Sequence, residues 1–118
     1  MTNISIWQRH LPQDIWLIGL QGRLDQTKTP QLEAELTQLF EEKSCSQLII
    51  DLSEVTYINS GGLRCLVGGW RKARQRDGNL ILCGLSSRLQ EIFTMVGFDK
   101  VFQIVTDIEE AQATLNKA

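Results

Sequence analysis

The chain has 118 residues, of which 42% are hydrophobic and 22% charged, with two prolines and nine glycines. This composition predicts one compact soluble domain over residues 1–118 and excludes a second domain of ordinary size and an intrinsically disordered chain. Twelve Lys and Arg against fourteen Asp and Glu give a net charge of -2, which argues against direct binding to nucleic acid or to a membrane surface.

The three cysteines, Cys45, Cys65 and Cys83, are odd in number and widely spaced, which is typical of reduced thiols rather than disulfides. Residues 1–9 lack the basic patch and the apolar stretch of a signal peptide. No segment approaches the roughly 18–20 apolar residues of a membrane span. We therefore expect a cytoplasmic protein that does not insert into a membrane.

Two adjacent strands are predicted near the N-terminus. Apolar and polar residues alternate within Ile4–Gln8, and the run Ile15–Leu20 is almost wholly apolar. Thr29 followed by Pro30 then has the pattern of an N-cap and a first helical residue, and apolar residues recur on one helical face as far as Lys43. This segment is expected to be the first helix.

Strands and helices alternate in the rest of the chain. The short apolar runs Leu48–Leu52 and Leu80–Cys83 predict strands that are buried on both faces. Between them, apolar residues at helical spacing predict a helix that follows Ser60 and stops near Asp77.

Two capping boxes are predicted further on, namely Ser87 with Gln90 and Thr106 with Glu109. The first opens a helix that ends at Gly97, a predicted C-cap, and the second opens a final helix through Leu115. A strand at Val101–Val105 lies between them. The order β-β-α-β-α-β-α-β-α predicts an α/β fold with a mostly parallel, four- or five-stranded mixed sheet and about four helices. The first strand is expected to run antiparallel at an edge.

Few residues support catalysis or cofactor binding. His10 is the single histidine and is interpreted as a surface loop residue, so no Ser-His-Asp or Cys-His arrangement is expected. The chain has neither of the two common glycine-rich phosphate-binding motifs and no recognised metal-ligand spacing. Asp51, at the end of a predicted strand, is expected to accept hydrogen bonds from loop backbone. No cofactor, metal or enzymatic activity is therefore predicted.

The loop before the central helix is the most distinctive part of the sequence. Ser60 is placed to cap that helix, and Gly61 and Gly62 leave its hydroxyl and the backbone open to a macromolecule. This loop follows the strand that ends near Leu52. Because the carboxyl ends of parallel strands meet at one edge of a sheet, we expect the loop to lie near Asp25, which follows the strand ending near Leu20.

The central helix itself has two unusual features. Gly68 and Gly69 each cost about 1 kcal/mol relative to alanine in a helix interior, so either close packing on the sheet or a smooth face for a partner is expected. Its C-terminal part carries four cations, which are explained by the negative end of the helix dipole: Arg71, Lys72, Arg74 and Arg76.

The segment Leu48–Leu63, LIIDLSEVTYINSGGL, resembles the strand-loop-helix stretch of STAS domains of the anti-sigma-factor antagonist type. That stretch ends in Asp-Ser-[Ser/Thr]-Gly-Leu in the family. Agreement continues in Gly22-Arg23-Leu24-Asp25 and in Val96-Gly97-Phe98, and the resemblance runs from about Ile15 to Leu115. Two positions depart from the family pattern: Asn59 replaces an aspartate, and Gly61 replaces a serine or threonine.

The resemblance implies a partner-switching module without catalytic activity. Such a protein binds an anti-sigma factor that is also an ATP-binding serine kinase, and thereby releases a sigma factor. The kinase phosphorylates the serine of the motif, by position Ser60, and a PP2C-like phosphatase that uses metal ions reverses the modification. The surface that would meet the partner is expected to comprise Asp25, Asn59, Gly61, Gly62 and Leu63, with residues of the following helix.

Phosphorylation of Ser60 would act on binding rather than on folding. The dianion would sit at the positive end of a helix, but a partner docked over it would bury an unpaired charge at a cost of several kcal/mol. The departures at Asn59 and Gly61 keep open an alternative, an accessory subunit of a transporter or sensory complex without a phosphate cycle. A small enzyme that uses Asp25 and Ser60 is a third hypothesis, which the lack of a suitable general base disfavours.

Overall fold

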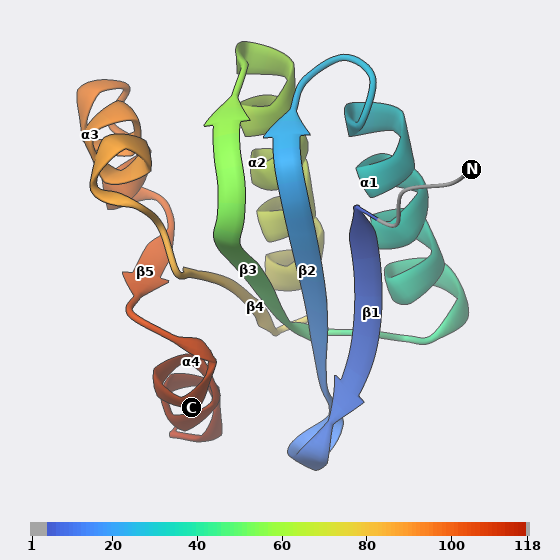
Figure 1. The fold of residues 1–118 in the computed structure, drawn as a ribbon. Coiled ribbons are helices and arrows are strands. Elements are labelled where there is room, and N and C mark those ends of the chain that lie inside the picture. The colour runs from blue at the N-terminus through green and yellow to red at the C-terminus, as the bar shows by residue number, and fades with distance from the viewer. Residues whose placement is uncertain (1–4, 118) are drawn as a thin grey trace.

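The computed structural model describes residues 5–117, so Ile4 of the first predicted strand and the ends of the predicted domain lie outside it. Its strands are β1 (Ile6–Leu11), β2 (Ile15–Leu24), β3 (Gln47–Ile58), β4 (Asn79–Cys83) and β5 (Gln103–Val105). Its helices are α1 (Thr29–Thr37), α2 (Ser60–Gln75), α3 (Ser87–Met95) and α4 (Ile108–Asn116). The predicted α/β class and element order are confirmed (Figure 1).

The five strands form one sheet in the order β1-β2-β3-β4-β5. The strand β1 pairs antiparallel with β2 at one edge, as predicted, and the remaining neighbours pair in parallel. A short 3-10 turn at Pro12–Asp14 connects the antiparallel pair. The parallel pairs need crossover helices, and these helices cover the two faces of the sheet.

Alternate residues of the central strands pack on opposite faces. On one face, Ile18, Ile50 and Leu82 contact a large cluster that includes side chains of α1, α2 and α3. On the other face, buried apolar residues pack against Ala111 and Leu115 of α4. In Figure 1, α1 and α2 lie behind the sheet. Successive residues of a strand point to opposite faces, so each continuous apolar run supplies side chains to both layers of the core.

Two strands are longer than the sequence predicts. The strand β2 ends at Leu24 rather than near Leu20, and β3 ends at Ile58 rather than near Leu52. The register of the pair shifts twice, between Gly19 and Gln21 and again between Gly22 and Arg23. Such bulges interrupt the alternation of apolar and polar side chains, which is why the pattern hides the last part of each strand.

Three helix caps lie one residue away from their predicted positions. The predictions that Ser60, Ser87 and Thr106 are N-caps are wrong, because each helix is capped by a neighbouring side chain. The observed caps are Asn59, Ser86 and Asp107, which accept the N–H groups of Gly62, Leu89 and Glu110 at 2.8, 3.2 and 2.8 Å. In each case the N-cap residue has extended backbone, and its side-chain oxygen accepts the N–H of the third helical residue. The residue that meets both conditions is a direct neighbour of the one that the sequence pattern predicts.

The first helix also differs at its start. Thr29 is the first helical residue and Lys28 the N-cap, while the Thr29 hydroxyl donates to the Asp25 carbonyl at 2.9 Å. The helix continues into a π-helical turn, Gln38–Glu42, so the predicted extension to Lys43 is confirmed. Gly97, with φ of 80°, follows α3 in the left-handed conformation that a glycine C-cap requires.

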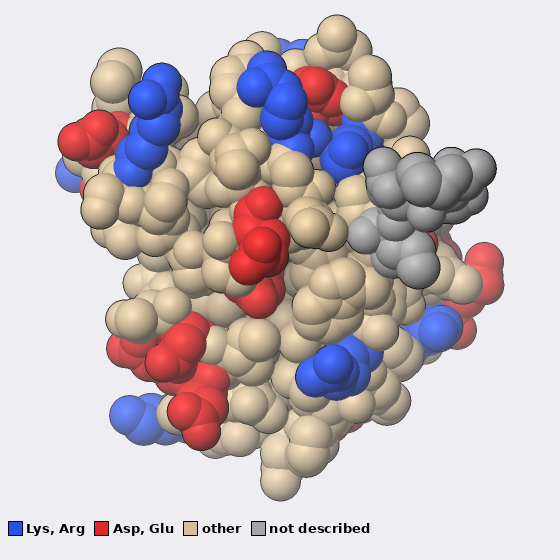
Figure 2. Space-filling view, viewed as in Figure 1, with Lys and Arg blue, Asp and Glu red and all other residues tan. Residues whose placement is uncertain are grey.

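Charges are distributed without a large area of one sign on the face shown in Figure 2, where acidic side chains gather over α4. Glu109 and Glu110 lie in the first turn of that helix, where its dipole favours them. Within the described residues, no helix combines the length and the apolar character needed to cross a bilayer.

Candidate functional site

The ends of β2 and β3 meet at one edge of the sheet, as expected. Leu24 pairs with Ile58, so Asp25 and Asn59 directly follow two paired residues. The Asn59 N–H donates to the Leu24 carbonyl at 3.1 Å, and its side-chain amide lies 3.5 Å from Gln26 Oε1. We call this region, residues 25–28 with residues 59–63, the carboxyl edge; both of its segments are visible at the top of Figure 1.

Asn59 and Ser60 have different roles at the start of α2. The Asn59 carboxamide oxygen accepts the Gly62 N–H at 2.8 Å and so caps the helix. Ser60 is the first helical residue and is exposed to solvent. Because a neighbour supplies the cap, the Ser60 hydroxyl is not needed for it and is accessible at the carboxyl edge.

The two glycines that follow have different surroundings. A Cβ on Gly62 would lie 2.9 Å from Leu24 Cγ and 3.0 Å from the Leu24 carbonyl oxygen, so glycine is required for α2 to approach β2. A Cβ on Gly61 would lie 3.4 Å from Asn59 Oδ1, an ordinary contact. Gly62 and Leu63 are buried beneath the carboxyl edge, whereas Ser60 is exposed and Gly61 half-buried at its surface.

Asp25 is held in its own turn. One carboxylate oxygen accepts from the Thr27 hydroxyl at 2.6 Å and from the Thr27 N–H at 3.0 Å, and the other lies 3.7 Å from Arg23 Nε. These hydrogen bonds, chiefly the one from the Thr27 hydroxyl, lower the pKa of Asp25 below its usual value. The side chain is therefore an ionised acceptor at neutral pH rather than a proton-transfer group.

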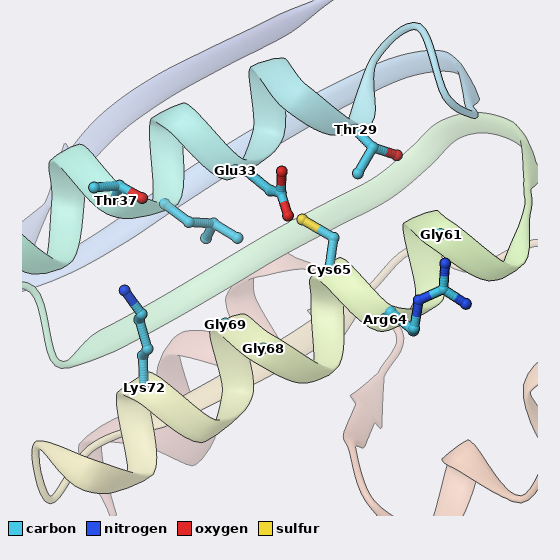
Figure 3. Close-up of a pocket in the computed structure, with 10 residues that line it drawn as sticks. Thr29, Glu33, Thr37, Gly61, Arg64, Cys65, Gly68, Gly69 and Lys72 are labelled. Carbon is cyan, nitrogen blue, oxygen red and sulfur yellow. The ribbon is translucent and has the colours of Figure 1, made fainter.

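A groove of about 500 Å³ runs between α1 and α2 and begins beside Gly61. Figure 3 shows Arg64 next to Gly61 at one end of this groove and Lys72 at the other, with Glu33 and Cys65 pointing toward each other between them. Burial, and to a smaller extent the Glu33 carboxylate, raises the pKa of the Cys65 thiol to about 11. The thiol is therefore protonated and a poor nucleophile at neutral pH.

The two glycines in the middle of α2, Gly68 and Gly69, differ in how closely other residues pack against them. A Cβ on Gly69 would lie 3.1 Å from a Leu80 methyl and 3.2 Å from a Leu36 methyl, so the expectation of close packing is confirmed there. Above Gly68 no atom lies within 4 Å, and the residue is exposed in the groove wall. Close packing therefore does not explain Gly68.

The polar residues considered as catalytic candidates have structural partners. His10 lies in β1 rather than in a loop; its ring stacks on Trp16 at 4.1 Å, and Nε2 lies 2.8 Å from Asp14 Oδ1. Asp51 lies within β3 rather than at the end of a strand, and it accepts the Ser53 N–H of the same strand at 3.0 Å rather than an N–H of a loop. Over residues 5–117, no group of three His, Cys, Asp or Glu side chains could hold a metal ion.

One residue of the site was missed by the sequence analysis. Arg64 extends toward the first turn of α2, and the closest of its nitrogens to Gly61, Nη2, lies 3.8 Å from the position of a Cβ there. Its spacing of four residues from Ser60 was a readable signal, because residues four apart share a helical face.

Comparison with known proteins decides the family. The model of the STAS domain family matches residues 7–111. The chain belongs to the STAS domain family. An anti-sigma-B factor antagonist of Listeria monocytogenes is 35% identical over 102 residues, which are 86% of this chain and 89% of the relative.

Solved structures support the same STAS fold. The anti-sigma factor antagonist SpoIIAA in its unphosphorylated form has a TM-score of 0.76 at 17% identity, over 97% of this chain and 99% of that protein. The Bacillus SpoIIAA in its phosphorylated form has a TM-score of 0.74 at 18% identity, over 93% of this chain and 99% of that protein. At these identities the likeness shows the fold alone.

Proposed function

We propose that this STAS domain protein is an anti-sigma-factor antagonist that binds an ATP-binding anti-sigma factor kinase and is switched off by phosphorylation of Ser60. A PP2C-like phosphatase restores the unmodified form, and the cycle takes place in the cytoplasm. The protein itself catalyses no reaction in this scheme and needs no cofactor. The observation that carries the proposal is the exposed Ser60 hydroxyl at the carboxyl edge, relieved of capping by Asn59.

The relatives support this assignment. The Listeria protein is named as an anti-sigma-B factor antagonist and is 35% identical to this chain over 102 residues. SpoIIAA has been solved in unphosphorylated and phosphorylated forms whose TM-scores to this chain are nearly equal. A phosphate is therefore compatible with a fold of this kind.

The chemistry of the modification requires only an accessible hydroxyl. The Ser60 oxygen attacks the γ-phosphorus of ATP, its proton passes to the kinase or to solvent, and ADP leaves. The product carries a charge of about -1.5 to -2 at the first turn of α2, where the helix dipole and the first N–H groups favour an anion. The fold is therefore retained after modification.

The same charge opposes docking. A partner that covers the carboxyl edge must remove the phosphate from water, and the cost of burying it is about 3–4 kcal/mol. At about 1.4 kcal/mol per factor of ten, this weakens binding a few hundredfold. Such a change is large enough to exchange one partner for another.

Phosphorylation of purified protein by its anti-sigma factor kinase and ATP tests the site directly, with mass spectrometry as the readout. Wild type is expected to gain one phosphate, and Ser60→Ala none. Ser87→Ala is a matched control, because Ser87 is also an exposed first residue of a helix, and it is expected to react like wild type. Equal labelling of wild type and Ser60→Ala would contradict the proposal.

The alternatives make different predictions. An accessory subunit would be recovered from its native cells with a membrane transport or sensory complex and without a kinase. An enzyme would hydrolyse generic ester or phosphate substrates in a reaction that Ser60→Ala abolishes. We expect neither result. For the enzyme, the physical reason is that hydrogen bonds from Thr27 lower the pKa of Asp25, so that its carboxylate is a weak general base near neutral pH.

A further inference from the structure

We infer that Arg64 is the intramolecular counter-ion of a phosphate on Ser60. This inference rests on the proposed function, because it concerns the modified form of the same serine. It adds a residue outside the Ser60 motif and assigns it a task, namely to neutralise part of the new charge and to hold the phosphate against α2.

The geometry of α2 brings the two side chains together. Ser60 and Arg64 are four residues apart, so they lie on one face of the helix with Cβ atoms about 5–6 Å apart. Both are exposed. The Arg64 side chain turns back toward the N-terminus, and its Nη2 lies 3.8 Å from the position of a Cβ on Gly61 (Figure 3). The guanidinium is thus already beside the residue that follows Ser60.

Arg64 is not engaged elsewhere in the described part of the chain. Among the ion pairs of residues 5–117, Lys72 of α2 and its C-cap Arg76 pair with Glu41 at 3.7 and 3.5 Å, and none includes Arg64. The helix itself contains no acidic residue. A phosphate on Ser60 would therefore meet little competition for this guanidinium from α2.

Two carboxylates from neighbouring elements face this region. Glu33 of α1 lines the same groove beside Cys65 but makes no ion pair with Arg64. Asp25 follows β2 and is held by Thr27 and Arg23. A phosphate with about two charges attracts a guanidinium more strongly than either single carboxylate at comparable distance. The planar guanidinium also matches two phosphate oxygens at once.

The pairing has a consequence for the switch. In the unmodified protein, Arg64 is an exposed cation at the end of the groove nearest Ser60. In the modified protein its charge is taken up by the phosphate, so phosphorylation both adds an anion at the carboxyl edge and withdraws a cation from it. A single modification thereby changes two charges on the surface.

Incorporation of phosphoserine at position 60 of the full chain by genetic encoding tests the inference without any kinase. The second pKa of the phosphate, about 6 for free phosphoserine, is measured by a 31P NMR titration. Because a nearby cation favours the dianion, Arg64→Gln is expected to raise this pKa by about half a unit.

Arg71→Gln is the matched control. Arg71 is exposed, lies on the same face of α2 and changes the net charge equally, but it is eleven residues from Ser60, roughly 16 Å along the helix. This variant is expected to change the pKa by less than about 0.1 unit because salt screens charges at that distance. Equal shifts in the two variants, or none in either, would overturn the inference.

The outcome is separable from that of the kinase experiment. If Ser60 is not a kinase substrate, the proposed function fails, yet the titration of the encoded phosphoserine still reports whether Arg64 pairs with a phosphate. If the titration shows no effect of Arg64, phosphorylation of Ser60 by the kinase can still be observed.

Discussion

At the scale of single residues, one side chain stabilises the start of α2 and a different one carries the hydroxyl that is proposed to be phosphorylated. Asn59 caps the helix through its carboxamide oxygen, and Ser60, the next residue, is exposed to solvent. If Ser60 were also the cap, phosphorylation would alter the capping oxygen itself. With the cap one residue earlier, Ser60 can change chemically while the helix keeps its start.

The two residues should therefore respond differently to alanine. Asn59→Ala is expected to lower the free energy of unfolding by about 1 kcal/mol, because it removes a side-chain N-cap. Ser60→Ala is expected to change it by less than about 0.5 kcal/mol, as for an exposed residue with no special contact. Urea unfolding followed by circular dichroism measures both, and a larger loss for Ser60→Ala than for Asn59→Ala would show that the serine is the cap.

At the scale of elements, α2 contains one glycine that packing explains and one that it does not. Gly69 lies against methyl groups of Leu80 and Leu36, whereas nothing lies within 4 Å of a Cβ on Gly68. Gly68 is in the wall of the groove between α1 and α2, along the same exposed face as Ser60 and Arg64. Its cost to helix stability is consistent with a face kept smooth for a partner.

The two alanine variants are expected to have opposite effects on stability. Gly68→Ala should raise the free energy of unfolding by up to about 1 kcal/mol, because it improves helix propensity without a new contact. Gly69→Ala should gain nothing or lose stability, because its methyl group crowds two leucine side chains at 3.1 and 3.2 Å. Thermal unfolding of both variants provides the comparison, and stabilisation by Gly69→Ala alone would contradict the packing described here.

The elements also show how far sequence patterns reach. The buried runs Leu48–Leu52 and Leu80–Cys83 were predictable as strands because strands covered on both faces are apolar throughout. The far ends of β2 and β3 were not, since bulges break their alternation. The meeting of Asp25 with the Ser60 loop followed from topology alone. The spacing of four residues placed Arg64 on the same helical face as Ser60, but the direction of its guanidinium was not predictable, because it depends on a side-chain conformation.

At the scale of the whole molecule, the sheet and its two helix layers bury all three cysteines. Burial, as the largest cause, raises the pKa of Cys45 and of Cys83 to about 12, and that of Cys65 to about 11. In the unfolded chain these thiols ionise near their usual value of 9.0. Folding therefore keeps the three thiols protonated over a pH range in which the unfolded chain loses their protons.

This difference predicts a loss of stability in alkali. Above about pH 9 the unfolded state binds fewer protons than the native state, so the free energy of unfolding should fall as pH rises.

At pH 8 the native thiols should react slowly with a disulfide reagent, Cys65 before the others because it lines the groove, and all three should react rapidly in denaturant. Fast reaction of all three in the native protein would contradict the burial.

The central claim is that phosphorylation of Ser60 alters binding while the fold stays the same. Calorimetric titration of the anti-sigma factor into unmodified protein, and into protein with phosphoserine at position 60, tests it most directly. A few hundredfold weaker binding of the phosphorylated form is expected. Equal affinity of the two forms, with both folded, would contradict the account.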